Sequence, residues 1–520
     1  MHPQPKRGVN PVGCLARMRS LALLVAVGLL GCGAGPVAES TATPGADLRF
    51  VVQTAPANPL VAIRLVFEVG SIDDPPGKEG LAALTAAMVG QGGATSRTYA
   101  ELLDALYPMA AGISVHVSRE LTTLSGTVHR DNLDAYVELM LDQILTPRFD
   151  PADFARNRSA AVDFITKTLR SEDDEALGKE ALEGALYAGH PYGHPVDGTE
   201  ASLSAITLDD VRAFHAQHFA RTRLTVGLGG GVPADLAEKL RARLAALPAG
   251  AARGPLPPAP PLTGRQVLLV DKPGRSTAIS IGHPHGLTRK DPDFVPLFLA
   301  MSYLGEHRTF NGVLMQNMRG KRGLNYGDYA YAEAFEQDGG STLPLPNVLR
   351  RLQRFEIWVR PVPADKAAFA LRQALFETQR VLEQGIPQQG FEETRDYLMA
   401  FSRLWTQDAD RRIGYAVDAA LAGRDLAADL QARLPTLTRD EVNAAMRKHI
   451  SLDHLVAVLA GPDAAALKDL LVSGVPTPLV YDTEGTPADI LAEDALIQVF
   501  PLALTADRIR IVPAATMFAR

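Results

Sequence analysis

Two stretches of this chain carry the same landmarks in the same order about 230 residues apart, and this duplication constrains the fold more than any other feature. Thr207 precedes His218 by eleven positions, and Thr438 precedes His449 by the same interval. Each histidine is followed by an apolar β-type run, at residues 224–228 and 455–459. Threonine before a helical pattern is a preferred N-cap, so we predict equivalent helices after Thr207 and Thr438. The sequence therefore predicts two homologous lobes.

Local composition divides the chain into segments. Residues 250–264 are rich in proline and lack periodicity, which is typical of a semi-rigid linker. We place one lobe at 47–249, a second at 265–475 and a C-terminal extension at 476–520. Within the extension, the runs at 497–500 and 509–512 resemble strands. In the second lobe, Asp365–Gln384 resembles a long helix that stops at Gly385. Alternating strands mixed with long amphipathic helices predict an α+β class, each lobe being a mixed or antiparallel sheet with helices packed on it.

The first 31 residues have the features of a secretory signal. Four basic residues, Lys6, Arg7, Arg17 and Arg19, precede the apolar run Leu21 to Leu30, which is too short to span a bilayer. The run ends in Leu29-Leu30-Gly31-Cys32, which resembles a bacterial lipobox, so we expect Cys32 to be lipidated. The alternative is an ordinary signal peptide that contains a cysteine. Residues 32–46 are predicted to form a flexible tether.

Charge and cysteine content exclude several classes of function. The formal charge is −7, and the predicted leader contributes only positive charge, so the exported chain is strongly acidic and we expect no nucleic-acid partner. Cys14 lies in the predicted leader, which is expected to be removed. Cys32 would then have no second cysteine with which to form an internal disulfide or a cysteine metal site. Gly33 after Cys32 resembles Gram-negative lipoproteins of the outer membrane, facing the periplasm or the cell surface.

A short helical pattern links the chain to a known family. Residues 80–88 read Gly-Leu-Ala-Ala-Leu-Thr-Ala-Ala-Met, after an alternating strand at 63–70 and a turn at 73–80. Over about residues 47–475 the chain resembles the insulinase/pitrilysin (inverzincin) metallopeptidases, in which this helix carries His-x-x-Glu-His. The matching positions are Ala83, Ala86 and Ala87, whose methyl groups neither coordinate zinc nor accept a proton. Without the family, Leu81, Leu84, Thr85 and Met88 form the buried stripe of an alanine-rich helix.

The resemblance implies that the two lobes face each other as a clamshell around a peptide-binding chamber. It also implies a third zinc ligand well after the helix, and Asp163 stands near that distance, but one carboxylate binds zinc weakly. The histidine pairs His190/His194, His215/His218 and His283/His285 lack the required spacing with a glutamate. We therefore expect no metal and no catalytic residue in this chain.

The second lobe retains a different family feature. Residues 317–327 resemble the segment whose arginine and tyrosine, seven positions apart, reach toward the substrate, and Arg319 and Tyr326 match that spacing. A guanidinium and a phenol hold a peptide carbonyl and stabilise oxyanion charge. The structural alternative is a helix end with a solvated Arg319, a turn at Gly323 and a half-buried strand from Tyr326.

These observations favour an exported, lipid-anchored insulinase-family homologue that is not catalytic alone. Its predicted role is to bind peptide through Arg319 and Tyr326 and to complete the site of a zinc-bearing sister subunit, or of a second copy of itself. One alternative is a peptide-binding or assembly module of the cell envelope without proteolysis. The other is an active zinc peptidase whose metal site has been rebuilt from other histidines.

Overall fold

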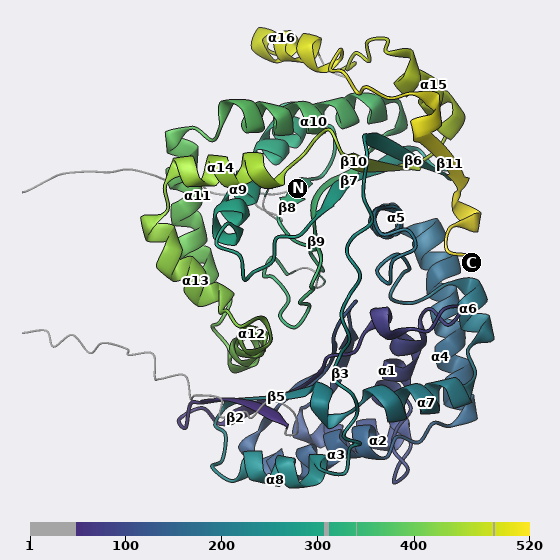
Figure 1. The fold of residues 1–520 in the computed structure, drawn as a ribbon, viewed down its shortest axis with the longest axis vertical. Coiled ribbons are helices and arrows are strands. Elements are labelled where there is room, and N and C mark those ends of the chain that lie inside the picture. The colour runs from purple at the N-terminus through teal and green to yellow at the C-terminus, as the bar shows by residue number, and fades with distance from the viewer. Residues whose placement is uncertain (1–47, 306–310, 338, 340, 482–483) are drawn as a thin grey trace, which may run out of the picture. The chain divides into compact units, whose positions relative to one another are not determined.

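The computed structural model describes residues 48–520, apart from 306–310, 338, 340 and 482–483, and has an α+β fold with two β-sheets (Figure 1). The predicted leader, Cys32 and the tether to residue 46 lie outside the described residues. Among the described residues, no helix combines the length and the apolar character needed to cross a membrane.

The two sheets repeat one topology. The first has the order β1-β5-β2-β4-β3, and the second has β6-β10-β7-β9-β8 with β11 added beside β6. The strands β1 and β5 are parallel, as are β6 and β10, while the other pairs shared by the two sheets are antiparallel. Five strands of each sheet thus correspond one to one, which confirms the two homologous lobes. The strands are β1 (Arg49–Thr54), β2 (Leu60–Phe67), β3 (Ser114–Val117), β4 (Thr122–His129), β5 (Leu224–Gly230), β6 (Arg265–Asp271), β7 (Ser276–His285), β8 (Asp328–Tyr331), β9 (Gln353–Pro363), β10 (Leu455–Gly461) and β11 (Ile509–Pro513).

Helices follow the strands in a matching order in both halves. Both predicted N-caps are confirmed, because Thr207 and Thr438 each accept a hydrogen bond from the backbone N–H three residues on and form a capping box. The helices are α1 (Leu81–Gln91), α2 (Tyr99–Leu106), α3 (Leu133–Leu145), α4 (Pro151–Asp163), α5 (Asp174–Leu186), α6 (Glu200–Ala205), α7 (Leu208–His218), α8 (Leu236–Leu244), α9 (Phe294–Gly305), α10 (Ala367–Gln384), α11 (Gln388–Phe401), α12 (Ala409–Ala422), α13 (Leu426–Arg433), α14 (Arg439–His449), α15 (Ala464–Ser473) and α16 (Ala488–Ile497).

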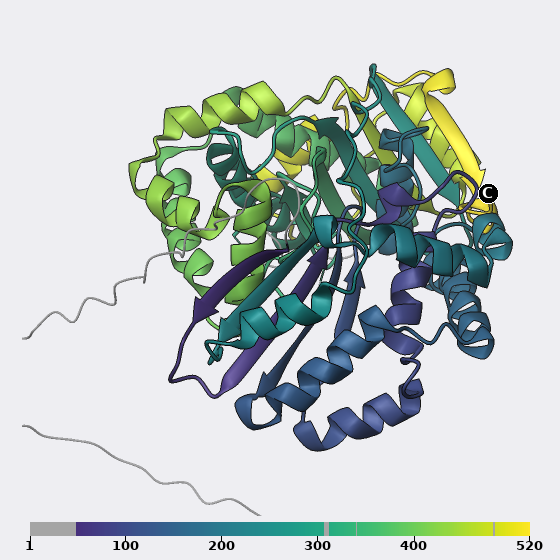
Figure 2. The same cartoon turned by 60° about the horizontal axis from the view of Figure 1, so that its bottom comes forward.

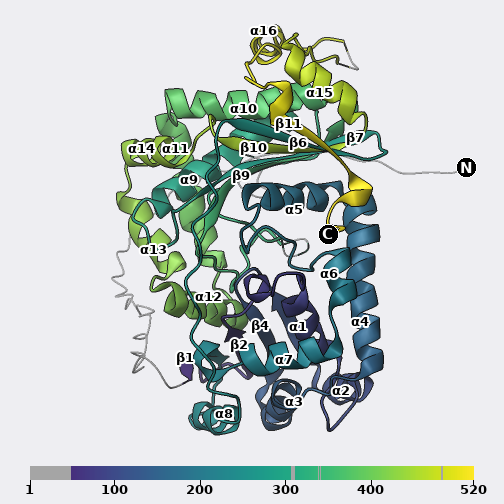
Figure 3. The same cartoon turned by 45° about the vertical axis from the view of Figure 1, so that its right-hand side comes forward.

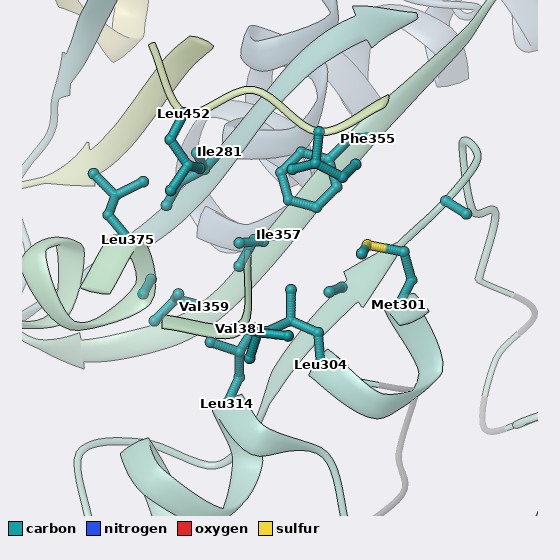
Figure 4. Packing of buried hydrophobic residues seen from close by; sticks show 14 of the residues in the cluster. Ile281, Met301, Leu304, Leu314, Phe355, Ile357, Val359, Leu375, Val381 and Leu452 are labelled. Carbon is teal, nitrogen blue, oxygen red and sulfur yellow. The ribbon is translucent and has the colours of Figure 1, made fainter. Parts of the chain in front are cut away.

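Each lobe has its own core on one face of its sheet. In the first lobe α3 and α8 cover this face (Figure 2), where Ile63, Leu65 and Phe67 of β2 are buried. In the second lobe α9 and α10 pack against Ile281 of β7 and against Phe355 and the other apolar residues of β9 (Figure 4). Because side chains alternate along a strand, the intervening residues point to the opposite face of each sheet.

That opposite face is covered by a helix from the other half of the chain (Figure 3). Leu177 and Leu182 of α5 pack on Leu268 and Val270 of the second sheet. Val417 of α12 packs on Val66 of the first sheet. The two lobes therefore exchange helices, and neither sheet is fully covered without the other half.

Glycines on β5 let α12 approach the first sheet closely. A Cβ at Gly227 would lie 2.8 Å from Val417, and one at Gly229 would lie 2.8 Å from the carbonyl oxygen of Ala409. Beside them, Arg64 of β2 donates through Nε to Asp410 of α12 at 3.0 Å. The absence of side chains at Gly227 and Gly229 and a partly buried ion pair together fix the position of α12.

The C-terminal extension differs in part from the sequence prediction. Residues 509–512 form a strand as predicted, since β11 pairs in parallel with β6. The predicted strand at 497–500 is wrong: Ile497 is the last residue of α16, and it and Phe500 are buried against the second core. A short alternating run cannot by itself distinguish a strand from a buried helix end.

We predict that Gly229→Ala destabilises the fold by about 1–3 kcal/mol, because the new methyl group meets backbone rather than a flexible side chain. Urea unfolding followed by circular dichroism measures the change. Gly112→Ala is the matched control, because a Cβ there meets no atom within 4 Å. Equal stability of the two variants would contradict close packing of α12 on β5.

Candidate functional site: a cavity between the lobes and an arginine–tyrosine pair

The helix α1 presents two faces. Leu81, Leu84, Thr85 and Met88 are buried, as the periodicity predicts. The spacing of Ala83, Ala86 and Ala87 places all three on another face of the helix, where they line a cavity of about 680 Å³. Three short side chains at one wall leave this space open.

The cavity wall combines elements from both lobes. Its first-lobe side includes β3, the end strand of its sheet, and its second-lobe side includes residues 334–337 and Trp358 of β9. His116 of β3 and Glu336 meet across the cavity, with 2.8 Å between Nε2 and Oε2. The charged residues of the wall are His116, Arg119, Lys179, Glu180, Glu183, Asp197, Glu336, Arg350 and Arg354.

Glu183 of α5 is the electrostatic centre of this wall. Its carboxylate is buried and forms ion pairs with Arg350 and Arg354 of the second lobe, and Arg119 of the first lobe lies 3.9 Å away. Burial acts to raise its pKa, but the three guanidinium groups outweigh burial and lower the pKa of Glu183 to about 2. The carboxylate is therefore fully ionised at neutral pH and joins the two halves.

Two other residues of the cavity wall, Lys179 and Asp197, have shifted pKa values. The Lys179 ammonium lies 3.6 Å from the centroid of the Trp358 ring, and burial lowers the pKa of this lysine despite the nearby Glu175. Burial, with the charge of Glu180, raises the pKa of Asp197 to about 6. The cavity wall thus combines ionisable side chains with the aromatic ring of Trp358.

The structure brings Arg319 and Tyr326 together, but not at the cavity wall. Arg319 lies at the end of the π-helical segment Met315–Gly320, and its Cζ is 4.5 Å from the centroid of the Tyr326 ring. Gly323, with φ of +61°, makes the turn between them. Tyr326 is 68% exposed, so the predicted half-buried strand start is absent, and β8 begins two residues later.

A chain of contacts connects this pair to the cavity. Arg360 lies 5.4 Å from the Tyr326 ring centroid and donates to Glu175 of α5 at 2.7 Å. Glu175 in turn lies 3.8 Å from Lys179, which lines the cavity. The exchanged helix α5 therefore lies between the pair and the cavity.

Asp328 is buried immediately after this pair. Burial raises the pKa of Asp328 to about 8, although Asn325 donates to its Oδ1 at 2.6 Å and the positive charge of Arg319 favours the ionised form. A neutral carboxyl group is thus present beside the arginine at neutral pH.

The other candidate residues do not converge. Asp163 is about half exposed, ion-pairs with Lys167 at 2.8 Å and is not part of the cavity wall. Ring nitrogens of His190, His215 and His285 lie within hydrogen-bond distance of backbone carbonyls, at 2.9–3.0 Å. Across the described part of the chain, no three His, Cys, Asp or Glu side chains are grouped so that they would hold a metal ion.

Sequence reasoning missed the cluster around Glu183. Its members come from positions 119, 183, 350 and 354, and a single sequence does not show which distant charges meet. The only local signal is the run Arg350-Arg351-Leu352-Gln353-Arg354, whose three arginines directly precede and enter a strand.

Two models of known protein families match this chain. Residues 49–200 match the model described as insulinase (peptidase family M16), and residues 205–398 match the peptidase M16 inactive domain. The two matches together cover well over half of the chain, which belongs to the insulinase family. The predicted family membership is thereby confirmed.

Individual relatives agree at the level of the family. An uncharacterised zinc protease of Streptomyces coelicolor is 26% identical over 59% of this chain and 67% of its own length. Another from Mycobacterium leprae is 28% identical over 58% of this chain and 66% of its own length. The matches thus span about two thirds of these relatives.

Solved structures share the fold. A peptidase M16 inactive domain from Pseudomonas fluorescens has a TM-score of 0.70 and 24% identity, covering 80% of this chain and 96% of that chain. A protease from Helicobacter pylori has a TM-score of 0.69 and 17% identity, covering 82% and 99%. The predicted two-lobed clamshell is confirmed by this likeness.

The cavity wall does not fit the zinc ion that the names of these relatives imply. The alanines of α1 offer no donor atom, and the nearest carboxylates on α5, Glu180 and Glu183, are paired with arginines. Zinc sites in proteins use three or four convergent nitrogen, sulfur or oxygen ligands. We therefore derive no reaction step through a metal in this chain.

We predict that Glu183→Gln destabilises the protein by about 3–5 kcal/mol at pH 7, because it leaves buried guanidinium groups without their shared carboxylate. A carboxylate with a lowered pKa stabilises the fold above its unfolded-state pKa, and this contribution is lost as the pH falls toward about 2. The difference between wild type and variant should therefore shrink in urea titrations below about pH 4.5.

The matched control is Glu180→Gln on the same helix, which removes a partly exposed carboxylate paired with Arg119 at 2.9 Å. We expect this control to lose about 1 kcal/mol or less. A pH-independent effect of Glu183→Gln would show that packing, rather than charge, carries its contribution.

Proposed function

We propose that this chain is a non-catalytic insulinase-family subunit that binds peptide and completes the active site of a zinc-bearing sister subunit. The observation that carries the proposal is the face formed by Ala83, Ala86 and Ala87, which lines a cavity between the lobes. The methyl groups of this face offer neither a zinc ligand nor a general base.

The Arg319–Tyr326 pair supports the second half of the proposal. The guanidinium and phenol are two hydrogen-bond donors suited to a peptide carbonyl and to oxyanion charge. Stacking on the Tyr326 ring limits the rotamers of Arg319, which lowers the entropy cost of presenting its donors. Because Tyr326 is exposed and neither residue lines the cavity of this chain, the pair is accessible to a second chain.

In the proposed mechanism the two chains divide the work. The sister subunit supplies zinc and the hydrolytic step. The residues of this chain hold the peptide carbonyl through Arg319 and Tyr326 and so orient the bond to be cut.

A second candidate is a module that holds peptides without cleaving them. One observation favours it: β3 is the end strand of its sheet and contributes residues 114–117 to the cavity wall. An extended peptide pairs readily with such an edge through main-chain hydrogen bonds. In such a module, Arg319 and Tyr326 would contribute to the affinity for the peptide and not to its hydrolysis.

Mixing this chain with a zinc-bearing insulinase-family subunit from the same organism tests the proposal. We expect hydrolysis of a quenched fluorescent peptide by the mixture, and a loss of about 100-fold in kcat/KM with Arg319→Ala, as for removal of an oxyanion donor. Lys321→Ala, an exposed neighbouring cation, is the control and should retain activity.

Three outcomes would count against this proposal. Unchanged activity with Arg319→Ala would remove the role of the pair. Peptide binding without hydrolysis in any mixture would favour the holding module. About one zinc per isolated chain, after dialysis against metal-free buffer, would favour a rebuilt metal site.

We also propose that Cys32 carries the lipid that anchors the protein to the outer membrane. The lipobox-like Leu29-Leu30-Gly31-Cys32 supports this, and several acyl chains give stable anchoring. Cells expressing the full chain should incorporate radiolabelled palmitate, and Cys32→Ser should abolish incorporation. Unlabelled wild-type protein, secreted in soluble form, would instead indicate an ordinary signal peptide.

A further inference from the structure

The C-terminal extension reaches the segment that carries Arg319 and Tyr326 through one buried arginine. The Arg322 side chain is fully buried, and it donates to Asp494 Oδ1 and Glu493 Oε2 of α16, both at 2.7 Å. Its remaining terminal nitrogen, Nη1, donates to the carbonyl oxygen of Asn317 at 2.9 Å. The guanidinium therefore links α16 to the backbone of the π-helical segment Met315–Gly320.

This link lies between the two residues of the pair. Arg322 follows Arg319 by three positions and precedes Tyr326 by four. The intervening turn is closed by backbone hydrogen bonds from Gly323 to Arg319 at 2.9 Å and from Leu324 to Met318 at 3.2 Å. Arg322 thus holds the turn that sets the direction of both side chains.

The carboxylates of α16 are themselves fixed. Asp494 accepts a hydrogen bond from Tyr481 at 2.6 Å, and Glu493 pairs with Arg380 of α10 at 2.5 Å. Ile497 anchors the end of α16 in the second core, and α16 lies along α10 (Figure 1). The contact to Arg322 is therefore made from a rigid support.

The burial of Arg322 makes its ion pairs with α16 important for the stability of this region. A buried guanidinium is costly unless carboxylates and other acceptors surround it, and here α16 supplies both carboxylates that pair with it. Loss of Asp494 leaves the buried guanidinium with Glu493 alone, a carboxylate that Arg380 shares, and this favours a rearrangement of Arg322 toward solvent. The extension also lies beyond residues 49–200 and 205–398, the parts that the family models match.

We propose that the C-terminal extension is a positioning element for the Arg319–Tyr326 pair, in which Asp494 and Glu493 hold Arg322 and thereby the stacked geometry of the pair. Asp494, Glu493 and Arg322 are positioning residues and do not touch the substrate. The relevance of this geometry to peptide binding depends on the function proposed above, whereas the geometry itself does not.

The test measures the stacked geometry directly. The Nε–Hε signal of Arg319 in a nitrogen-15 spectrum of the full exported chain should carry a ring-current shift from Tyr326. Arg319→Lys assigns the signal by its loss, and Tyr326→Leu gives its position without the ring. We expect Asp494→Asn to move the signal most of the way toward that position, and Asp494→Glu to restore part of the shift.

Asp489→Asn is the matched control, because Asp489 is exposed in the first turn of the same helix. It should leave the Arg319 signal in place. If Asp494→Asn does not fold, Glu493→Gln is measured instead, since it keeps Asp494 and still removes a charged partner of Arg322. An unmoved Arg319 signal in the folded variant would overturn the positioning role.

Activity in the mixed complex separates this proposal from the preceding one. If the pair binds peptide, Asp494→Asn should lower kcat/KM in the same direction as Arg319→Ala. A displaced Arg319 signal with unchanged activity would support the positioning role and contradict the function proposed for the pair. An unmoved signal with reduced activity would overturn the positioning role alone.

Discussion

The exchange of helices between the two halves is the interaction on which the rest of this structure depends. The helix α5 of the first half covers the second sheet, and α12 of the second half covers the first. Each exchanged helix buries apolar side chains that its own lobe does not cover, so the two lobes stabilise one another. The glycines of β5 and the Arg64–Asp410 pair belong to this contact, because the glycines allow α12 to approach the first sheet and the ion pair joins the helix to it.

The same exchange creates the cavity. Since α5 is held against the second sheet, Glu183 meets Arg350 and Arg354 from the other lobe, while its neighbours face α1 of its own lobe across the open space. In a metallopeptidase of this family the wall opposite would supply zinc ligands, whereas here it supplies methyl groups. The strong ion pairs near the cavity therefore serve to join the lobes, and the alanines leave room for a ligand.

The duplication could be predicted from sequence because it rests on local signals that recur. The threonine caps at 207 and 438 and the glycine stop at 385, where φ is +74°, are each determined within a few residues. Arg319 and Tyr326 could be singled out from their spacing and the family resemblance, but the stacking of one side chain on the other could not. The ion-pair partners of Glu183 and of Arg322 could not be predicted, because each ion pair joins residues that lie 64 or more positions apart in the sequence.

The Arg319–Tyr326 pair is positioned without any contribution from α1. The pair belongs to the second lobe, whose core and strands do not involve α1, so its geometry does not depend on which side chains α1 carries. Its supports are instead Arg360, which connects it to α5, and Arg322, which connects it to α16. The function proposed above assigns peptide orientation to this pair and the hydrolytic step to another chain, and the elements that position the pair are separate from α1.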